Sequence, residues 1–244
     1  MACWLEWLRV DWSPPILFSL YVNDMPSPSQ HVKLALYTDD TAIIAICRKP
    51  TLLISYPESY LNDLQRWMSE WWIAINVSKS TAIIFALARW HFIQHQPVTL
   101  FSEPIQWVDT TCYLGVTLDT RLTWSPHIDQ VWKRSAQRIS KLGPLLNRKS
   151  DLSIRNWVLL HKQLICPMMD YACSAWRSGA CTHVRRLQVL QSNSLHRATG
   201  APWYVSSWQI HEHLGVLLFA DHIRALTASF DSKEMAAPGC SNVE

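Results

Sequence analysis

Glycine is scarce in this chain, which has six glycines among 244 residues. Glycine-rich loops bind phosphates in P-loop and dinucleotide-binding folds, so neither of these folds has support. The chain also lacks an uncharged apolar run of about 18 residues, which argues against a membrane span or a membrane partner. Its N-terminal segment carries Glu6, Arg9 and Asp11 between apolar residues, so we do not expect a signal peptide.

Closely spaced cysteine pairs are absent as well. The seven cysteines are scattered, and no two of them are separated by two residues. This pattern is typical of reduced thiols in an intracellular protein, nuclear or cytoplasmic and not secreted. Cys166, Cys173, Cys181 and His183 have the chemistry of zinc ligands. However, the six and seven residues between the cysteines fit no close-paired zinc pattern.

Charge is distributed unevenly along the chain. The total is +3, and 49% of the residues are apolar, which is enough for a folded core. Residues 126–200 contain twelve basic and three acidic residues, a net charge of +9, and the remainder carries −6. A basic segment beside acidic ones indicates a surface that faces polyanions such as nucleic acids. The alternative is a helical surface that uses arginine and lysine for solubility.

The first half of the chain mixes helical and strand patterns. Prolines at its start and end delimit a short helix over Pro14–Asp24. Val32–Tyr37 and Thr41–Cys47 are apolar runs around a short polar connection, which predicts a β-hairpin. An amphipathic helix is expected over Pro57–Trp72, and Ile73–Phe85 has a broken strand pattern. Three shorter strands are expected near Val98–Phe101, Ile105–Trp107 and Cys112–Leu118.

After Trp124 the pattern becomes helical. Apolar residues recur at helical spacing in four segments, at 128–142, 154–164, 184–194 and 216–230. We therefore predict an α+β fold in which a mixed part precedes a helical part, with a boundary near Thr123–His127. The remaining residues, 232–244, include proline, glycine and serine and are expected to form a flexible tail.

Two adjacent carboxylates, Asp39 and Asp40, occupy the tip of the predicted hairpin. Like charges side by side repel, and no lysine or arginine adjoins them in the sequence. A hard cation such as Mg²⁺ would relieve this repulsion, because it prefers carboxylate and phosphate oxygens. Two-metal phosphoryl transfer uses such an arrangement. The alternative is a hairpin that uses aspartate for its turn propensity.

The surrounding residues favour the first interpretation. The string LYTDDTAIIA, preceded by SPPILFSLYVNDMP, resembles the reverse transcriptases of non-long-terminal-repeat (LINE-type) retrotransposons, particularly the jockey-like group. In that family an aromatic-x-Asp-Asp hairpin carries catalytic metal ligands. Residues 37–40, Tyr-Thr-Asp-Asp, match it, with Thr38 where the family more often has alanine.

Further motifs extend the resemblance from about Ser13 to about Leu217. Trp67, Ile75-Asn76 and Lys79-Ser80 are similar to an Asn-x-x-Lys-Thr element of the family. Residues 113–128, with Tyr-Leu-Gly-Val, Leu-Asp, Leu-Thr-Trp and His-Ile in order, look like a primer-grip strand pair and the entry to the thumb. Arg197 and residues 200–203 fit jockey-like thumb sequences. The resemblance therefore implies a partial polymerase palm over residues 13–124 and a helical thumb over 125–231, with residues 1–12 unmatched.

The resemblance also implies roles for individual residues. Asp39 and Asp40 would bind Mg²⁺, or Mn²⁺, and Lys79 would act near the leaving pyrophosphate. Implied partners are an RNA/DNA template–primer duplex and deoxynucleotides. Residues implied in gripping primer or nucleic acid are Tyr113, Leu114, Gly115, Lys133, Arg134, Arg138 and Lys141. Residues implied in supporting template and nucleotide are Ser13, Pro14, Phe18 and Tyr37.

The chain departs from the family at its N-terminal end. Family enzymes carry another catalytic aspartate on a strand upstream of the position of Pro14, preceded by fingers, and residues 1–13 do not resemble that strand. Asp11 occupies the wrong place in chain order to replace it. We therefore expect this polypeptide alone to polymerise nothing. Two alternatives stay open: a non-catalytic nucleic-acid-binding remnant of a retroelement, and a pseudogene product without function.

Overall fold

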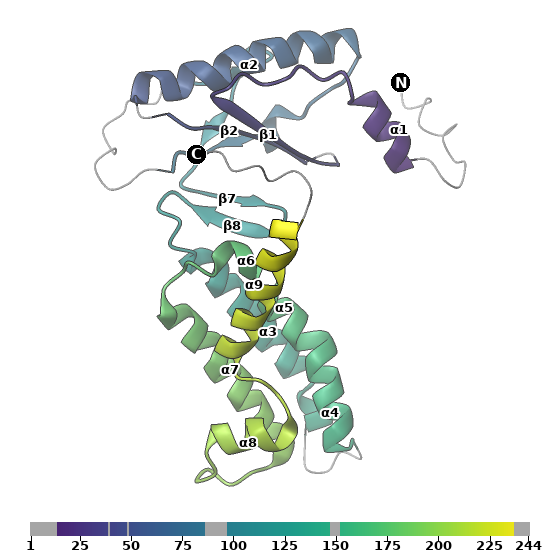
Figure 1. Ribbon diagram of the computed structural model, residues 1–244, viewed down its shortest axis with the longest axis vertical. Helices are drawn as coiled ribbons and strands as arrows, with labels where there is room; N and C mark the ends of the chain where they lie inside the picture. The colour runs from purple at the N-terminus through teal and green to yellow at the C-terminus, as the bar shows by residue number, and fades with distance from the viewer. Residues whose placement is uncertain (1–13, 39, 48, 86–96, 147–151, 237–244) are drawn as a thin grey trace. The chain divides into compact units, whose positions relative to one another are not determined.

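The computed structural model describes residues 14–38, 40–47, 49–85, 97–146 and 152–236 (Figure 1). The chain forms two compact units, residues 1–115 and 116–244. Helices and small sheets are both present, which confirms the expected α+β class. No helix in these ranges is long and apolar enough to cross a membrane. The palm and thumb assignments, with their boundary at Trp124, stay predictions.

In the first unit a helix packs on a β-hairpin (Figure 1). Strands β1 (Val32–Tyr37) and β2 (Asp40–Ala45) pair antiparallel, as predicted. Helix α1 (Pro14–Tyr21) precedes them and α2 (Pro50–Glu70) follows. The core between α2 and the hairpin contains buried or partly buried Val32, Leu34, Ile43, Leu61 and Leu64.

Helix α2 differs from its predicted extent. It begins at Pro50, ends at Glu70 and contains Pro57, so the predicted start at Pro57 is wrong. Pro50 in the first turn has no N–H that needs a partner, which suits a helix start. Pro57 removes one internal hydrogen bond, but the turn before it buries Ile54 against the core. That apolar burial favours continuing the helix through the proline.

The rest of the first unit is built from short pieces. Strands β3 (Thr81–Ala82) and β6 (Gln106–Trp107) pair parallel, whereas β4 (Thr99–Leu100) and β5 (Glu103–Pro104) pair antiparallel. Strand β7 (Thr110–Tyr113) ends the unit. The expected break in the strand pattern of residues 73–85 falls at the polar stretch 76–80, which forms a capped 3-10 turn. On either side of it only β3 is a strand, so the strand prediction for residues 73–75 and 83–85 is wrong.

The second unit is mainly helical. It begins with β8 (Val116–Asp119), and in its described residues helices then follow one another to residue 236. These are α3 (Ser125–Lys141), η3 (Gly143–Leu146), α4 (Ile154–Leu160), η4 (His161–Ile165), α5 (Cys166–Asp170), α6 (Cys173–Trp176), α7 (Cys181–Thr199), α8 (Ser207–Leu214) and α9 (Phe219–Ala236). The sequence pattern predicted the last helix over residues 216–230 and a flexible tail over 232–244, whereas α9 begins at Phe219 and continues to Ala236.

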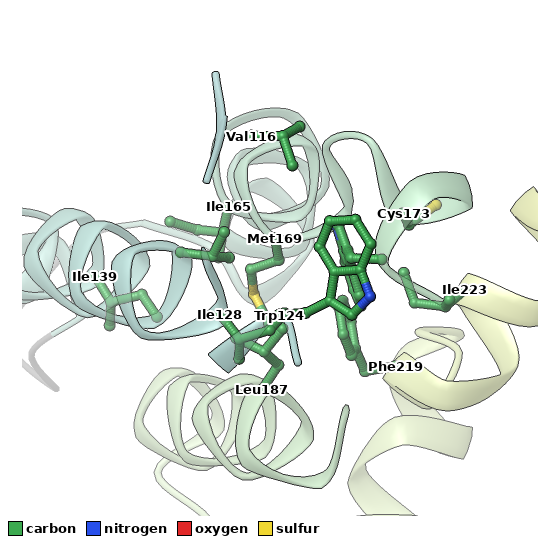
Figure 2. Packing of buried hydrophobic residues seen from close by; sticks show 12 residues of the cluster. Val116, Trp124, Ile128, Ile139, Ile165, Met169, Cys173, Leu187, Phe219 and Ile223 are labelled. Carbon is green, nitrogen blue, oxygen red and sulfur yellow. The ribbon is translucent and has the colours of Figure 1, made fainter. Parts of the chain in front are cut away.

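One apolar core joins α3, η4, α5, α6, α7 and α9 (Figure 2), and a smaller cluster around Leu195, Ile210 and Val216 joins α7 and α8. Ile128 of α3, Met169 of α5, Leu187 of α7 and Phe219 of α9 are at most 1% exposed. Trp176 stacks on Phe219 with ring centroids 6.5 Å apart. Because each buried side chain of this size stabilises the fold by about 1.5–3 kcal/mol, the core fixes the positions of the helices within this unit.

Candidate functional site

The Tyr-Thr-Asp-Asp motif lies at the tip of the β1–β2 hairpin. Tyr37, the last residue of β1, is the cross-strand partner of Asp40, the first residue of β2. Two residues, 38 and 39, separate them in the sequence. Thr38 has φ of +50°, as the first position of a tight hairpin turn of the primed types requires. Asp39 lies outside the described residues, so its role as a metal ligand stays a prediction.

The register places Asp40 on the hairpin face away from the core. Cross-strand partners share a face, and successive residues alternate between faces. Val32, Leu34 and Ile43 face the apolar core below α2. Asp40 and Tyr37 therefore occupy the other face, where Asp40 is exposed and 62% of Tyr37 is exposed. A carboxylate at this position is open to a ligand from solvent.

The charge of Asp40 is not compensated by an ion pair within the described part of the chain. The described residues also contain no cluster of three or more His, Cys, Asp or Glu side chains that could hold a metal. Asp24, the nearest described carboxylate upstream of the hairpin, accepts a hydrogen bond from the Trp67 indole N–H at 3.2 Å. Asp24 is therefore engaged in fixing α2, as a turn residue would be.

Lys79 ends a short 3-10 helix, η2 (Val77–Lys79), and is exposed. The Asn76 side chain organises this turn, because its oxygen accepts hydrogen bonds from the Ser78 N–H at 3.1 Å and the Ser78 hydroxyl at 2.5 Å. The Lys79 N–H donates to the Asn76 carbonyl at 3.1 Å. The Asn-x-x-Lys spacing is thus explained locally: the asparagine caps the turn that presents the lysine.

The residues of the predicted primer grip lie in two different settings. Tyr113 ends β7 and is partly buried, and Leu114 and Gly115 follow it with φ of +46° and +75°. Two successive left-handed positions make a tight turn, for which the glycine is suited. The other predicted residues lie on α3 in the second unit. The gripping role of both groups stays a prediction.

Helix α3 carries a basic stripe on its exposed side. Ile128, Val131, Ser135 and Ile139 are buried on its other side. The basic residues follow i, i+1, i+5 and i+8 spacing, all are exposed, and none forms an ion pair within the described part of the chain. They are Lys133, Arg134, Arg138 and Lys141. Four uncompensated cations on one helix face can contact the phosphates of a nucleic-acid backbone.

Two other basic residues of the segment 126–200, Arg177 and Arg186, are already paired. Arg177 forms an ion pair with Asp231 at 2.6 Å. Arg186 pairs with Asp129, and its guanidinium lies 5.0 Å from the centroid of the Trp132 ring. Fewer basic side chains are therefore available to bind a polyanion than the net charge of residues 126–200 implies. Among those without an ion pair in the described residues, the four of the α3 stripe lie together on one helix.

Asp119 is a carboxylate whose role the motifs did not indicate. It is 8% exposed. It accepts hydrogen bonds from the Thr123 N–H at 3.0 Å, the Thr123 hydroxyl at 2.9 Å and the Trp124 N–H at 3.0 Å. These bonds hold Trp124 at φ of +64° immediately before α3. The Leu-Asp and Leu-Thr-Trp motifs are thus parts of one turn that starts α3.

The residues predicted to support template and nucleotide lie on α1 and β1. Ser13 is outside the described residues, and Pro14 begins α1. Phe18 is 40% exposed on the same helix, where Ile16 and Leu20 are more than 60% exposed. Tyr37 is exposed beside Asp40. The supporting role of these residues stays a prediction.

Comparisons with known proteins agree with the motifs. The chain is 30% identical to an RNA-directed DNA polymerase from mobile element jockey of Drosophila funebris, over 90% of this chain and 24% of that protein. It is 29% identical to a probable RNA-directed DNA polymerase from transposon X-element of Drosophila melanogaster, over 90% of this chain and 24% of that protein. It is 27% identical to an RNA-directed DNA polymerase from mobile element jockey of Drosophila melanogaster, over 88% of this chain and 24% of that protein.

The match covers nearly all of this chain but about a quarter of the length of these relatives. No protein-family profile matches the chain, and no solved structure matches it. The resemblance inferred from the motifs is nevertheless confirmed by the relatives. Along about 90% of its length, this chain is a relative of one segment of the jockey-like RNA-directed DNA polymerases, the reverse transcriptases of non-long-terminal-repeat retrotransposons.

Proposed function

We propose that this chain supplies the metal-binding hairpin and the duplex-binding thumb of an RNA-directed DNA polymerase. The observation that carries the proposal is the register at the hairpin tip. Tyr37 opposes Asp40 across a two-residue turn, so the family motif occupies the tip and exposes a carboxylate. The similarity to retrotransposon polymerases supports the interpretation of this carboxylate as a metal ligand. Residues 13–124 would then be part of a palm and residues 125–231 a thumb.

The residues at the hairpin tip fit a hard divalent cation. Asp40 has a solvent-open carboxylate without an ion-pair partner among the described residues, and Mg²⁺ prefers such oxygens together with phosphates. Asp39 and Asp40 would hold Mg²⁺ or Mn²⁺, which when bound stabilises the charge that develops on the transferring phosphoryl group. Lys79, presented by the Asn76-capped turn, would bind the pyrophosphate through its ammonium group.

In this proposal α3 binds the template–primer duplex. Its four exposed cations would neutralise backbone phosphates without reading bases, because phosphate contacts fix position and carry no sequence information. Release of condensed counterions makes such binding steeply salt-dependent. The same stripe supports a second candidate function: a non-catalytic protein that binds nucleic acid with α3 and makes no use of the hairpin.

Binding of an RNA/DNA template–primer, measured with and without Mg²⁺, distinguishes these functions. If the hairpin takes part, Mg²⁺ with the next complementary deoxynucleotide strengthens binding of the unmodified chain, and Asp40→Asn removes that gain. Asp109→Asn, which changes another exposed carboxylate of the first unit, serves as the matched control. Binding that is salt-dependent but indifferent to Mg²⁺ in every variant favours the second function. Absence of binding contradicts both.

Primer extension by the 244-residue chain alone is expected to be absent. The family site is implied to share its metals with a third carboxylate on a strand that the resemblance does not cover. Incubation with an RNA template, a DNA primer and deoxynucleotides in Mg²⁺ or Mn²⁺ checks this. Extension that disappears with Asp40→Asn would overturn the expectation and show that the chain's own carboxylates suffice.

A further inference from the structure

Three large aromatic side chains are exposed where α7 connects to α8: Trp203 and Tyr204 lie in the connection, and Trp208 lies in the first turn of α8. Trp203 is 92% exposed, Tyr204 72% and Trp208 59%. The rings of Trp203 and Tyr204 form a T-shaped pair with centroids 6.1 Å apart. Exposed aromatic groups of this size mark binding surfaces, because burying them is favourable and exposing them is costly. Figure 1 shows α8 at the opposite end of the second unit from β8.

The turn that bears Trp203 and Tyr204 is closed by a hydrogen bond and anchored on both sides. Trp203 and Tyr204 are the two central residues of a turn closed by a 3.0 Å hydrogen bond from the Val205 N–H to the Pro202 carbonyl. On either side of it, Ala201 and Val205 pack against the buried cluster of Leu195, Ile210 and Val216. The rings therefore project from a rigid base, and their exposure is a property of the fold.

Both ends of this connection are fixed as well. Gly200 ends α7 in a left-handed conformation, with φ of +61°. Ser206 starts α8 with a capping box that it shares with Gln209. The His196 imidazole and the Ser207 hydroxyl lie at hydrogen-bond distance, 3.2 Å. A preorganised surface loses little conformational entropy when a ligand binds.

The surroundings of the turn combine apolar surface with two basic residues. Beside the turn lies a groove of about 620 Å³ lined by four apolar residues, Ala201, Val205, Ile210 and Leu214, and four polar ones, Thr199, Gln209, Glu212 and His213. Arg197, in the last turn of α7, is exposed and forms no ion pair in the described ranges. Lys162 reaches the end of α8, where it donates to the Gly215 carbonyl at 3.2 Å.

We propose that Trp203, Tyr204 and Trp208 form a stacking platform for single-stranded nucleic acid, at the end of the second unit away from β8. Bases would stack on the aromatic faces while Arg197 and Lys162 attract the phosphates, a combination that binds single strands with little sequence preference. The inference rests on the proposed function and deepens it. The α3 stripe would bind the duplex, and this platform would bind the unpaired template strand that continues from the duplex.

Fluorescence anisotropy with the full chain and two ligands tests the platform. One ligand is a blunt RNA/DNA duplex, and the other is the same duplex with an unpaired RNA extension of about eight nucleotides, within the span of known single-strand sites. The unmodified chain is expected to bind the extended ligand about tenfold more tightly. Trp203→Ala combined with Tyr204→Ala removes this preference and leaves blunt-duplex binding unchanged. Trp203→Phe retains most of it.

Two controls make the result specific. Phe230→Ala removes an aromatic residue of α9 that is 51% exposed, and it should not change either affinity. A fluorescent base analogue in the unpaired extension should be quenched by the unmodified chain and not by the Trp203→Ala, Tyr204→Ala variant, because stacking quenches its emission.

Several outcomes would overturn the inference. Equal binding of the two ligands by the unmodified chain would do so while leaving the proposed function standing. So would a double variant that weakens blunt and extended ligands equally, or one that only dissociates a dimer of the chain in sedimentation, which would assign the surface to a second copy. Failure to bind either ligand would contradict the proposed function and this inference together.

Discussion

At the scale of single residues, Asp119 belongs to a family motif but has a structural role, because it accepts the hydrogen bonds that close the turn before α3. Burial raises the pKa of its carboxyl, but hydrogen bonds from Thr123, Trp124 and Arg121 lower it more, so the pKa lies below its ordinary value. The family resemblance included this aspartate only as part of a string. The hydrogen bonds of Asp119 depend on how the turn between β8 and α3 closes. No pattern of residue types indicates that geometry, so the structural role of Asp119 could not be predicted from the sequence alone.

Replacing Asp119 is expected to destabilise the second unit. Asp119→Ala leaves the Thr123 and Trp124 N–H groups without their acceptor and should cost about 2–3 kcal/mol, whereas Asp119→Asn should cost about 1 kcal/mol. Because the folded pKa is lowered, the contribution is present above the unfolded pKa of about 3.9 and is lost as pH falls through the folded pKa. Urea unfolding at pH 7 and at several pH values below the unfolded pKa of about 3.9 measures both effects, and equal midpoints for all three proteins would contradict them.

His161 is a second residue whose environment decides its behaviour. The Ser194 hydroxyl donates to the Gln191 carbonyl at 2.7 Å and therefore accepts from His161 Nδ1 at 3.4 Å. His161 Nε2 then carries a lone pair that is buried without a partner among the described residues. Burial, with smaller effects of His211 and Lys162, lowers the pKa of His161 to about 4.

This histidine predicts a loss of stability in acid. The unfolded chain binds the proton near pH 6.5 and the folded chain only near pH 4, so the unfolding free energy falls as pH drops through that window. His161→Asn keeps a donor for Ser194 and cannot titrate, so its stability should fall less between pH 7 and pH 5. Urea midpoints across this range provide the check. Parallel pH profiles for the two proteins would show that His161 is not responsible.

At the scale of elements, hydrophobic periodicity predicted α3 well. Ile128, Val131, Ser135 and Ile139 lie on its buried side as the spacing indicated, which leaves its cations exposed. Periodicity failed at α8 (Ser207–Leu214), because none of the four predicted helical segments covers these residues. His211 is 3% exposed, and its ring lies 3.0 Å from the Val216 carbonyl and 3.2 Å from the Ser192 hydroxyl. A helix that buries a polar residue breaks the apolar pattern on which the prediction relied.

The basic stripe of α3 makes a prediction about salt dependence. Arg138→Gln with Lys141→Gln should weaken duplex binding similarly for all sequences. It should also reduce the slope of log affinity against log salt concentration by about one for each phosphate that is no longer neutralised. Arg224→Gln is the matched control, because Arg224 is already paired with Asp221 on α9. Anisotropy titrations at several salt concentrations measure the slope, and an unchanged slope would exclude α3 from the interface.

At the scale of the whole molecule, the chain is two units with different charge. Residues 1–115 carry −3 and residues 116–244 carry +6. Composition and motif order were sufficient to predict the α+β class and the polymerase resemblance. They could not predict the division after Gly115, since compactness depends on contacts between residues far apart in the chain. Nor could they distinguish paired cations such as Arg186 from those of the α3 stripe.

The central claim is that the hairpin tip binds a divalent metal, and iron-mediated cleavage tests it most directly. Fe²⁺ that replaces Mg²⁺ generates hydroxyl radicals in the presence of ascorbate and peroxide, and these cut the backbone beside the metal even where binding is weak. We predict a cut within residues 37–41 that excess Mg²⁺ suppresses, that Asp40→Asn abolishes and that Asp109→Asn leaves intact. The absence of a cut there, or a cut unaffected by Asp40→Asn, would contradict the account.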